Sequence, residues 1–423
     1  MPRRALLLSL VLVAVLVVPG AAWSAPPPGG ETRAGDAWLS VVAEARTTCG
    51  VKKDHTAWCW GRNTNGQLGD GTSASRSVPT RIKGSWAAIS IGSTYPGGET
   101  VCAVRTDGAG YCWGWSRWGQ TGAQGKKDVL RPSKLPGRWR SVTAAGDFTC
   151  GIRTDGSGWC WGRNFFGQLG HGTSQDSSVP LRLPGVWKSL SLYADTACGI
   201  QTDATGWCWG ENDDGRAGVG TTELRVTTPA LLPGAWRELT VDGLNTCGVQ
   251  TDGTGWCWGY NAFGNVGDGT TDDRLVPTQV AGAWRSITPD VVTCGIRVDG
   301  TGWCWGDGTN LPAQVPGMWA SLSSNLWTTC GVQVGGSGWC WGRNTDGQVG
   351  DGTKKNRSTP TRLTGRWSMV GSRGDLMTVG VRTDGSGWTW GYNSHGQVGD
   401  GTIKDRLTPY RLPEKHDRSI LGA

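Results

Sequence analysis

Cysteine is the residue whose type and spacing carry the most chemistry in this 423-residue chain. Its fourteen cysteines fall into seven pairs, and the two members of a pair are always ten residues apart. No CxxC spacing occurs and only four histidines are present, so the usual zinc-ligand patterns are missing. Two thiols at a constant separation are expected to face each other across a β-hairpin, close enough for a disulfide. The predicted pairs are Cys49 with Cys59, Cys102 with Cys112, Cys150 with Cys160, Cys198 with Cys208, Cys247 with Cys257, Cys294 with Cys304, and Cys330 with Cys340.

A hairpin explains why the spacing is constant. Between Cys150 and Cys160 lies Thr154-Asp-Gly156, whose Gly suits the left-handed position of a three-residue hairpin loop. Near the C-terminus, Val379 and Thr389 stand at the same spacing, so both cysteines are absent together, as a bonded pair predicts. Buried, reduced thiols are the alternative, since free Cys packs well in a core. We predict seven disulfides, formed in an oxidising compartment.

Acid–base and metal-binding residues lack suitable partners. Asp155 and the other Asp residues of Thr-Asp-Gly turns, like Asp70 in Asp-Gly-Thr, are expected to cap their own turns. None of the histidines accompanies a nucleophile motif such as Gly-x-Ser-x-Gly, and loops such as 344–348 lack the spaced acidic ligands of a calcium site. We therefore predict a protein that is not an enzyme and that holds no metal or cofactor. A secreted enzyme whose site is assembled from distant residues in the funnel of the fold is the alternative.

The elements that position the cysteines repeat along the chain. Eight copies of Trp-Cys-Trp-Gly, or of a one-letter variant, recur about every 48 residues. We number the repeats 1 to 8 in chain order, one for each copy of this motif. Each repeat offers four short strands, which we name the Pro strand, the lone-Trp strand, the Cys-Gly strand and the Trp-Cys-Trp strand. In Trp58-Cys-Trp60 the alternation places apolar groups on both faces, so both faces should be buried. Four strands per repeat predict one blade of an all-β propeller.

The predicted propeller has eight four-stranded blades and spans residues 37–412. Its first repeat starts at Trp38 without a Pro strand, whereas the last repeat ends with an extra one at 408–412. We therefore expect the N- and C-terminal segments to share the closing blade, which would leave no open sheet edge. The sixth repeat is shortened between Gly306 and Pro312, so seven blades remain the alternative. Residues 413–423 are predicted to form a C-terminal tail.

The N-terminus has the layout of a secretory signal peptide over residues 1–24. Arg3 and Arg4 precede an apolar run, and small residues follow it. The run is shorter than the roughly 20 residues of a membrane span, which disfavours a permanent anchor. Residues 25–36 are expected to form a flexible linker. Loss of the two arginines lowers the net charge from +7 to +5, too mild to indicate nucleic acid. We expect a secreted, extracellular monomer without membrane contact after cleavage.

The composite motif resembles the regulator-of-chromosome-condensation repeat family. The resemblance is carried by Cys150-Gly-Ile-Arg-Thr-Asp-Gly156, Trp159-Cys-Trp-Gly-Arg-Asn164 and Gly167-Gln-Leu-Gly-His-Gly-Thr173, which recur in order along residues 37–412. The resemblance implies a propeller, most often with seven blades and a split closing blade. Members include nuclear exchange factors for a small GTPase, and an exchange-factor role is the least favoured interpretation here because of the signal peptide. We expect a member of the secreted bacterial type.

The loops after the Trp-Cys-Trp strands carry the candidate binding residues. These loops share a framework but vary in side chain, as binding loops on a rigid scaffold do. Large aromatics occur in repeats 2, 3 and 5, and lysines border them in repeat 2, which predicts one aromatic arc on one rim. We expect this arc to recognise an unknown extracellular protein, or a glycan, in a binding or scaffold role. The candidate residues are Trp115, Trp118, Phe165, Phe166, Tyr260, Phe263, Lys126 and Lys127.

Overall fold

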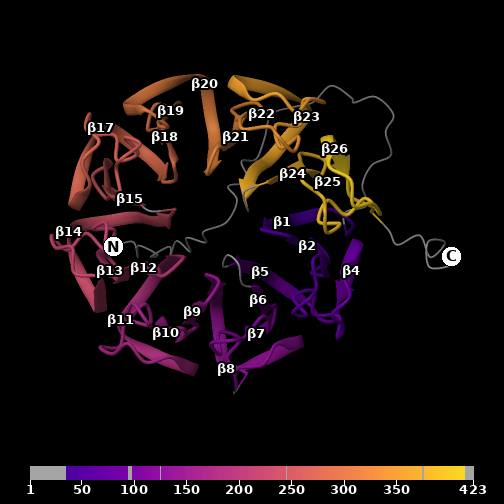
Figure 1. The fold of residues 1–423 in the computed structure, drawn as a ribbon, viewed down its shortest axis with the longest axis horizontal. Coiled ribbons are helices and arrows are strands. Elements are labelled where there is room, and N and C mark those ends of the chain that lie inside the picture. The colour runs from indigo at the N-terminus through magenta and orange to yellow at the C-terminus, as the bar shows by residue number, and fades with distance from the viewer. Residues whose placement is uncertain (1–34, 94–97, 124, 244, 374–375, 415–423) are drawn as a thin grey trace, which may run out of the picture. The chain divides into compact units, whose positions relative to one another are not determined.

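The computed structural model describes residues 35–93, 98–123, 125–243, 245–373 and 376–414. The predicted signal peptide, most of the predicted linker and most of the predicted tail lie outside these residues. The described secondary structure is entirely β, and this part of the chain contains no helix long and apolar enough to cross a membrane. The strands follow one another around a ring, as in a β-propeller (Figure 1). The all-β prediction is confirmed.

Each repeat folds into the strands that its pattern predicts. The Cys-Gly strands are β2 (Thr47–Lys52), β6 (Glu99–Arg105), β9 (Phe148–Arg153), β12 (Thr196–Gln201), β15 (Asn245–Gln250), β18 (Val292–Arg297), β21 (Thr328–Gln333) and, in the last repeat, β24 (Met377–Arg382). The Trp-Cys-Trp strands are β3 (Ala57–Gly61), β7 (Ala109–Gly114), β10 (Ser157–Gly162), β13 (Thr205–Glu211), β16 (Thr254–Gly259), β19 (Thr301–Gly306), β22 (Ser337–Gly342) and β25 (Gly387–Gly391).

The Pro strand of one repeat usually runs straight into the lone-Trp strand of the next. The resulting long strands are β8 (Val129–Ala144), β11 (Ser177–Tyr193), β14 (Arg225–Asp242), β17 (Arg274–Thr288), β20 (Thr309–Asn325) and β23 (Arg357–Arg373). Separate short strands occur only near the chain ends of the described part: β1 (Trp38–Glu44), β4 (Arg76–Ile82), β5 (Trp86–Ser93) and β26 (Arg406–Arg411). A long strand pairs with two sheets, since β11 meets β10 with its first half and β12 with its second.

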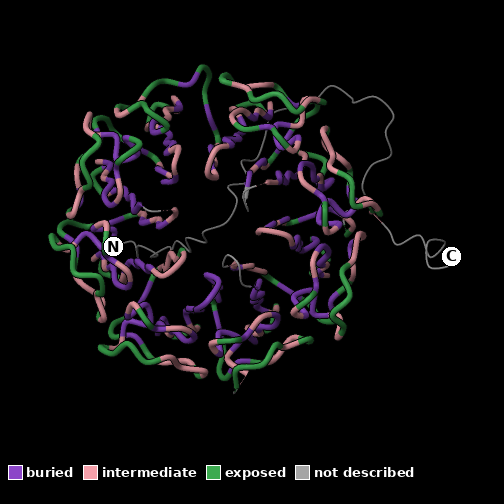
Figure 2. Tube along the Cα trace, in the orientation of Figure 1, coloured by how far each residue is buried: buried purple, intermediate pink, exposed green. Residues whose placement is uncertain are grey.

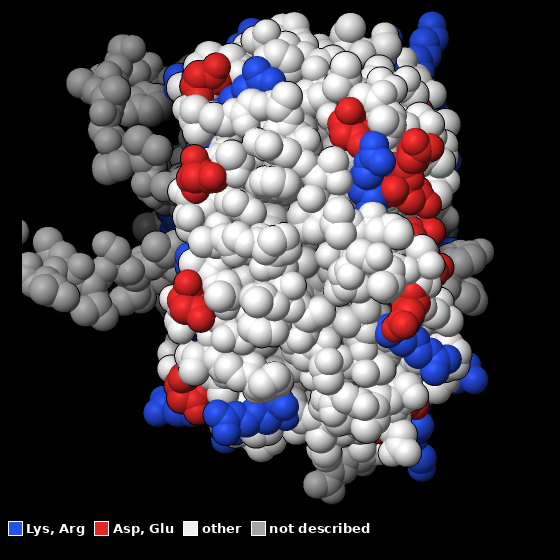
Figure 3. All heavy atoms as spheres, turned by 90° about the vertical axis from the view of Figure 1, so that its left-hand side faces the viewer, with Lys and Arg blue, Asp and Glu red and all other residues white. Residues whose placement is uncertain are grey.

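The lone-Trp strands lie nearest the centre of the ring and the Pro strands form its outer wall (Figure 1). Buried residues concentrate in the strands between them, and exposed residues follow the outer wall (Figure 2). Along the outer wall over β11, β14 and β17, charged side chains gather at the two edges and most of the middle is uncharged (Figure 3). The ends of the strands are therefore the charged parts of this surface.

Tryptophan pairs fill the core of each sheet. The lone Trp packs against the second Trp of the Trp-Cys-Trp strand, with ring centroids 5.4–6.0 Å apart. A Cβ added to Gly199 would lie 2.6 Å from the Trp187 ring, which explains why Gly follows Cys in this strand. The second Trp also ties the sheets together, because Trp209 donates its indole N–H to the carbonyl of Gln168 in the preceding loop, at 2.9 Å.

The predicted shared closing blade is wrong. β26 pairs with β25 and so completes the sheet of the last repeat, while β4 completes the sheet of β1. The reason is that each Pro strand joins the sheet of the Trp-Cys-Trp strand that precedes it, so the sheet that begins at Trp38 already has its fourth strand. The first and last sheets are joined instead by side-chain packing and by hydrogen bonds. The Trp38 N–H donates to the Gly385 carbonyl at 2.8 Å, as Trp139 does to Gly108 at 2.7 Å.

All seven cysteine pairs are disulfide-bonded in the structure, in the pairing that their spacing predicts. Each bond crosses a Cys-Gly/Trp-Cys-Trp hairpin with a Cα–Cα distance of 4.1 Å. The structure has no free cysteine among its described residues. The bonds join Cys49 to Cys59, Cys102 to Cys112, Cys150 to Cys160, Cys198 to Cys208, Cys247 to Cys257, Cys294 to Cys304, and Cys330 to Cys340.

An aliphatic side chain of the loop in the same repeat covers most of these disulfides. Leu68 packs with Cys49 and Cys59 in repeat 1, and Val349 packs in one cluster with both cysteines of repeat 7. The shortened sixth repeat has no such residue, and Cys304 is only partly buried. The seven disulfides thus have the same Cα–Cα distance but differ in how far a loop side chain buries them.

We predict that Cys294–Cys304 is the first disulfide to be reduced in the native protein. A disulfide with one partly exposed cysteine is more accessible to thiolate attack than one whose two cysteines are buried under the loop. Under a mild reductant, alkylation at these two positions should run on the order of tenfold faster than at the other pairs. Differential alkylation followed by peptide mass spectrometry measures this, with Cys150–Cys160 as the internal control. Equal labelling of both pairs would show that the missing loop residue gives no access.

Candidate interaction face

The antiparallel order of the strands gathers two kinds of connection at one end of the sheets. These are the loops that follow the Trp-Cys-Trp strands and the turns between the lone-Trp and Cys-Gly strands, which together we call the loop face. Backbone hydrogen bonds join the two, as from the Arg62 N–H to the Arg46 carbonyl at 2.9 Å and from Trp115 to Glu99 at 3.0 Å. The loop face is therefore a continuous rim of paired connections.

A buried asparagine organises the long loops of six repeats, whereas in repeat 2 the buried Ser116 stands at this position and its hydroxyl contacts that of Thr121 at 2.6 Å. Asn63 is fully buried, donates its amide to the Thr72 and Ala74 carbonyls at 3.0 Å, and accepts from the Leu68 N–H at 2.9 Å. The same hydrogen bond, from the backbone N–H of the residue five positions on to the asparagine Oδ1, recurs at Asn164, Asn212, Asn261, Asn344 and Asn393. The loops are thus held by their own framework. The side chains between Asn and Gly take no part in these bonds of the asparagine.

The Asp residues of the turns have the predicted structural role. Asp155 accepts from the Ser157 backbone and hydroxyl, at 2.9 and 2.6 Å. Asp70 accepts from Thr72 at 2.8 Å and pairs with Arg76 at 2.9 Å. Burial opposes ionisation of Asp70, but these hydrogen bonds and the guanidinium hold its pKa below the ordinary value. These carboxyl groups therefore accept hydrogen bonds that hold their own turns.

Three of the predicted aromatic residues meet around one arginine. The guanidinium carbon of Arg163 lies 5.6 Å from the Trp118 ring, 5.8 Å from Phe165 and 5.7 Å from Phe166. Phe165 and Phe166 are in edge contact at 4.8 Å, and Phe165 is 47% exposed. We call Trp118, Arg163, Phe165 and Phe166 the aromatic cluster. It joins the loops of repeats 2 and 3 and presents large apolar surface next to a cation.

The other predicted residues of repeat 2 border this cluster unequally. Lys126 lies 5.6 Å from the Trp118 ring and pairs with Asp176 at 3.3 Å. Lys127 is exposed. Trp115 is half-buried and packs beside Gly98. The basic border is therefore supplied mainly by Lys126.

Tyr260 and Phe263 form a second, separate group. Their rings lie 5.9 Å apart, and Phe263 also meets Trp327 at 6.1 Å. Trp327 belongs to the turn between β20 and β21, and it was not predicted because nothing in its repeat marks that turn. The short sixth loop lets the two aromatics meet, since no long loop stands between repeats 5 and 7 at that point. The single aromatic arc is thus two groups.

Repeat 4 separates the two groups with charge. Arg216, whose side chain is 5% exposed, pairs with Glu211 at 3.0 Å, Asp213 at 3.3 Å and Asp214 at 2.7 Å. Nearby, Asp195 pairs with Arg163 at 3.5 Å. Burial raises the pKa of Asp195 and of Glu211 despite these cations. The charged turn residue Asp195 links repeat 4 to the aromatic cluster, a connection that sequence alone does not show.

One further titratable residue lies in the lone-Trp strands. Glu238 of β14 stands where the other repeats have Ser, Ala or Met, and burial raises its pKa to about 7 although Arg237 opposes the shift. The substitution at one position of the repeat is the signal that sequence reading missed. Within the described residues no group of three or more His, Cys, Asp or Glu side chains has a geometry that could hold a metal ion.

Family models place the sequence among known proteins. Two models of the regulator of chromosome condensation (RCC1) repeat match residues 54–95, 155–199, 252–295, 336–371 and 384–422, and residues 40–67 and 139–168. The Arabidopsis thaliana ultraviolet-B receptor UVR8 is 41% identical over 76 residues, which are 18% of this chain and 17% of that protein. The probable E3 ubiquitin-protein ligase HERC4 of Homo sapiens is 28% identical over 103 residues, or 23% and 10%. The matched segments are a small part of both relatives.

Solved structures agree on the fold. Prp20p from Saccharomyces cerevisiae has a TM-score of 0.61 at 17% identity, covering 90% of this chain and 88% of that one. Human WBSCR16 has a TM-score of 0.59 at 17% identity, covering 84% and 93%. These identities show a shared fold alone, but the repeat models together match more than half of the sequence. The chain belongs to the regulator of chromosome condensation (RCC1) repeat family.

Proposed function

We propose that the chain is an eight-bladed propeller, secreted as a monomer, that binds a partner protein through its loop face and catalyses no reaction. Eight successive four-strand ladders, from β1–β4 to β23–β26, support the blade number. The signal-peptide layout and the seven disulfides support secretion. Members of this fold bind proteins, as the structural report on Prp20p names Gsp1p and histones for that protein.

The aromatic cluster is the observation that carries the proposal. Phe165 is 47% exposed, and Asn65 or Asp214 stands at the equivalent of Phe166 in other loops, so the fold does not require an aromatic side chain there. Aromatic side chains next to an arginine are typical anchors of protein interfaces, where a few of them dominate affinity. The neighbouring acidic loop of repeat 4 would select a partner with basic groups beside its apolar surface.

A photo-crosslinking experiment tests where the partner binds. Benzoylphenylalanine replaces Phe165 on the loop face, or Val334, which is 67% exposed in the turn at the opposite end of the strands. The mature protein is then irradiated in the medium of the cells that secrete it. A discrete protein adduct at position 165 that is absent at position 334 supports the proposal. Adducts at 334 alone would place the interface on the opposite face.

We predict that Trp118→Ala combined with Phe166→Ala weakens binding to the crosslinked partner by at least about 2 kcal/mol. The buried framework residues of the two loops, Ser116 and Asn164, make their hydrogen bonds without these side chains, so the melting temperature should change little. Titration calorimetry and thermal unfolding measure the two effects. The matched control is Tyr260→Ala with Phe263→Ala, which likewise removes two aromatic side chains, here from the second group. Unchanged affinity in the first variant and a loss in the control would move the anchor to repeats 5 and 7.

A further inference from the structure

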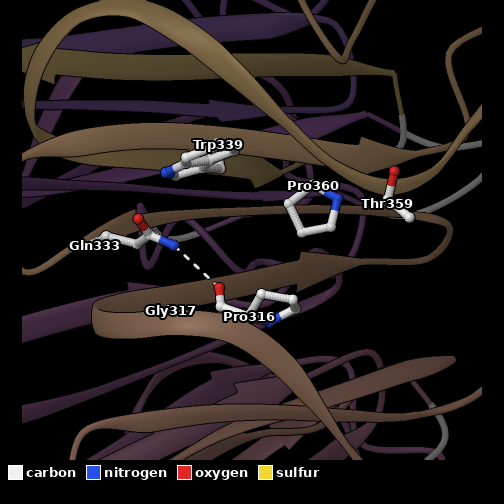
Figure 4. Close-up of a pocket in the computed structure, with 6 residues that line it drawn as sticks. All are labelled: Pro316, Gly317, Gln333, Trp339, Thr359 and Pro360. Carbon is white, nitrogen blue, oxygen red and sulfur yellow. Dashed lines mark hydrogen bonds between the residues drawn. The ribbon is translucent and has the colours of Figure 1, made fainter.

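A shallow cleft near the turns opposite the loop face exposes one indole ring between two prolines. The cleft has a volume of about 390 Å³ and is lined by Pro316, Gly317, Gln333, Trp339, Thr359 and Pro360 (Figure 4). Its residues come from β20, β21, β22 and β23, so it spans the junction of repeats 6 and 7. None of the six is ionisable. The cleft therefore suits an uncharged ligand.

The first Trp of the Trp-Cys-Trp strand is covered by a cation in several other repeats. The guanidinium carbon lies 3.9 Å from the ring centroid for Arg153 and Trp159, 3.7 Å for Arg297 and Trp303, and 3.7 Å for Arg382 and Trp388. Such a guanidinium occupies the face of the ring. The guanidinium thus already occupies one face of each of these indoles.

Repeat 7 has Gln333 where those repeats have Arg. The Gln333 amide donates to the Pro316 carbonyl at 3.1 Å and accepts from the Ser337 hydroxyl at 3.2 Å, so it is tied to its own turn (Figure 4). The Trp339 ring is half-buried, and its N–H is held by Ser337 at 3.1 Å. The indole is thus fixed in orientation, and no cation of the described residues stacks on it as Arg153 does on Trp159.

Repeat 3 supplies an internal comparison. The corresponding Pro136, Gly137, Val179 and Pro180 line a hollow of about 760 Å³, but Trp159 is not among its lining residues. Arg153 stacks on that indole. The prolines and the hollow are therefore common to both repeats, whereas the indole lines the hollow beside Gln333 and not beside Arg153.

We propose that the Trp339 cleft binds one pyranose ring of a neutral oligosaccharide. The C–H bonds on one face of a pyranose carry partial positive charge and match the negative face of an indole, while the prolines limit its position. A volume near 390 Å³ is within the range of small-ligand sites. A proline-rich peptide would need a groove lined by several aromatic side chains, and Trp339 is the one aromatic in this lining.

The same residue types stand at the same places in repeats 4 and 5. The sets are Pro184, Gln201, Trp207 and Pro229 in repeat 4, and Pro233, Gln250, Trp256 and Pro277 in repeat 5. The register agrees, since Trp207 pairs with Leu231 and Trp339 with Arg362, each two residues after the Pro. Weak single sites repeated on one rigid protein give avidity for a polymer.

Indole N–H resonances of the ¹⁵N-labelled mature protein test the proposal. The probes are cellohexaose, laminarihexaose and chitohexaose, with decaproline as the competing class. We expect one of the sugars to shift the Trp339 signal, which Trp339→Phe identifies. Gln333→Arg should place a cation over the ring and weaken that binding at least tenfold at an unchanged melting temperature. Arg153→Gln should make the Trp159 signal respond to the same sugar.

The outcomes separate the alternatives. Absence of any sugar-induced shift at Trp339, or equal affinity in Gln333→Arg, would overturn the proposal. Shifts by decaproline without shifts by sugar would show a peptide site and would also overturn it. Because this cleft lies at the other end of the strands from the aromatic cluster, none of these results bears on the loop-face proposal.

Discussion

Deletion of residues 406–423 is expected to lower the melting temperature by at least about 10 °C or to cause aggregation. The deletion removes β26, which leaves β25 with an unpaired edge of backbone N–H and C=O groups. It also removes Leu412, which is 1% exposed and packs in one cluster with Trp38 and Trp60. The pair Arg406–Asp400 is lost as well. Differential scanning calorimetry of the mature protein and its truncated form measures the change.

A pair of point variants makes the same test quantitative. Leu183 in repeat 3 occupies the position that Leu412 occupies in the last repeat, and it packs against Trp187 as Leu412 packs near Trp38. Each Leu→Ala change removes a buried side chain and should cost about 2–4 kcal/mol of unfolding free energy. Equal costs would mean that the junction of the chain ends is as tight as an internal junction. A cost at Leu412 well below that at Leu183 would show a ring that opens at this point.

The hairpins could be predicted from sequence because their causes are local. A ten-residue spacing, a Gly-containing turn and alternating apolar side chains are all visible in one repeat, and Cys150–Cys160 formed as expected. The closing sheet could not be predicted in the same way. Whether β26 pairs with β25 or with β1 depends on whether a Pro strand joins the sheet before it or the sheet after it. The repeat pattern in the sequence is the same in both cases. Only the pairing in space decides between them.

The residues of the candidate face could be predicted only in part, because sequence shows unusual residues but not their neighbours in space. Trp118, Phe165 and Phe166 depart from the loop consensus, so the sequence marks them, but the sequence does not show that Arg163 is their common neighbour. Trp327 reaches Phe263 only because the sixth loop is short, which couples residues of repeats 5 and 7 through a deletion in repeat 6. A contact that depends on a short loop elsewhere in the chain has no sequence motif of its own, so it could not be predicted.

Glu238 gives the second large expected effect, on stability as a function of pH. Its pKa is about 7 in the folded protein and close to 4.5 when exposed to water, because burial disfavours the charged carboxylate. Between these two values the folded state holds a proton that the unfolded state has released. Stability from this group is therefore full below about pH 4.5 and is lost as the pH rises through about 7. The loss corresponds to about 3 kcal/mol at most.

We expect Glu238→Gln to remove this dependence, because an amide of the same shape carries no charge at any of these pH values. The variant should be more stable than the parent at pH 8, by up to about 3 kcal/mol, and nearly equal to it at pH 4.5. Urea unfolding at the two pH values measures the difference, and Glu223→Gln, at an exposed loop position, is the matched control. A constant offset between parent and Glu238→Gln at both pH values would mean that Glu238 is ionised in the folded ring. A nearby cation would then have to offset the effect of burial on the carboxylate. Arg237, whose charge lowers the pKa of Glu238, is the residue to mutate next.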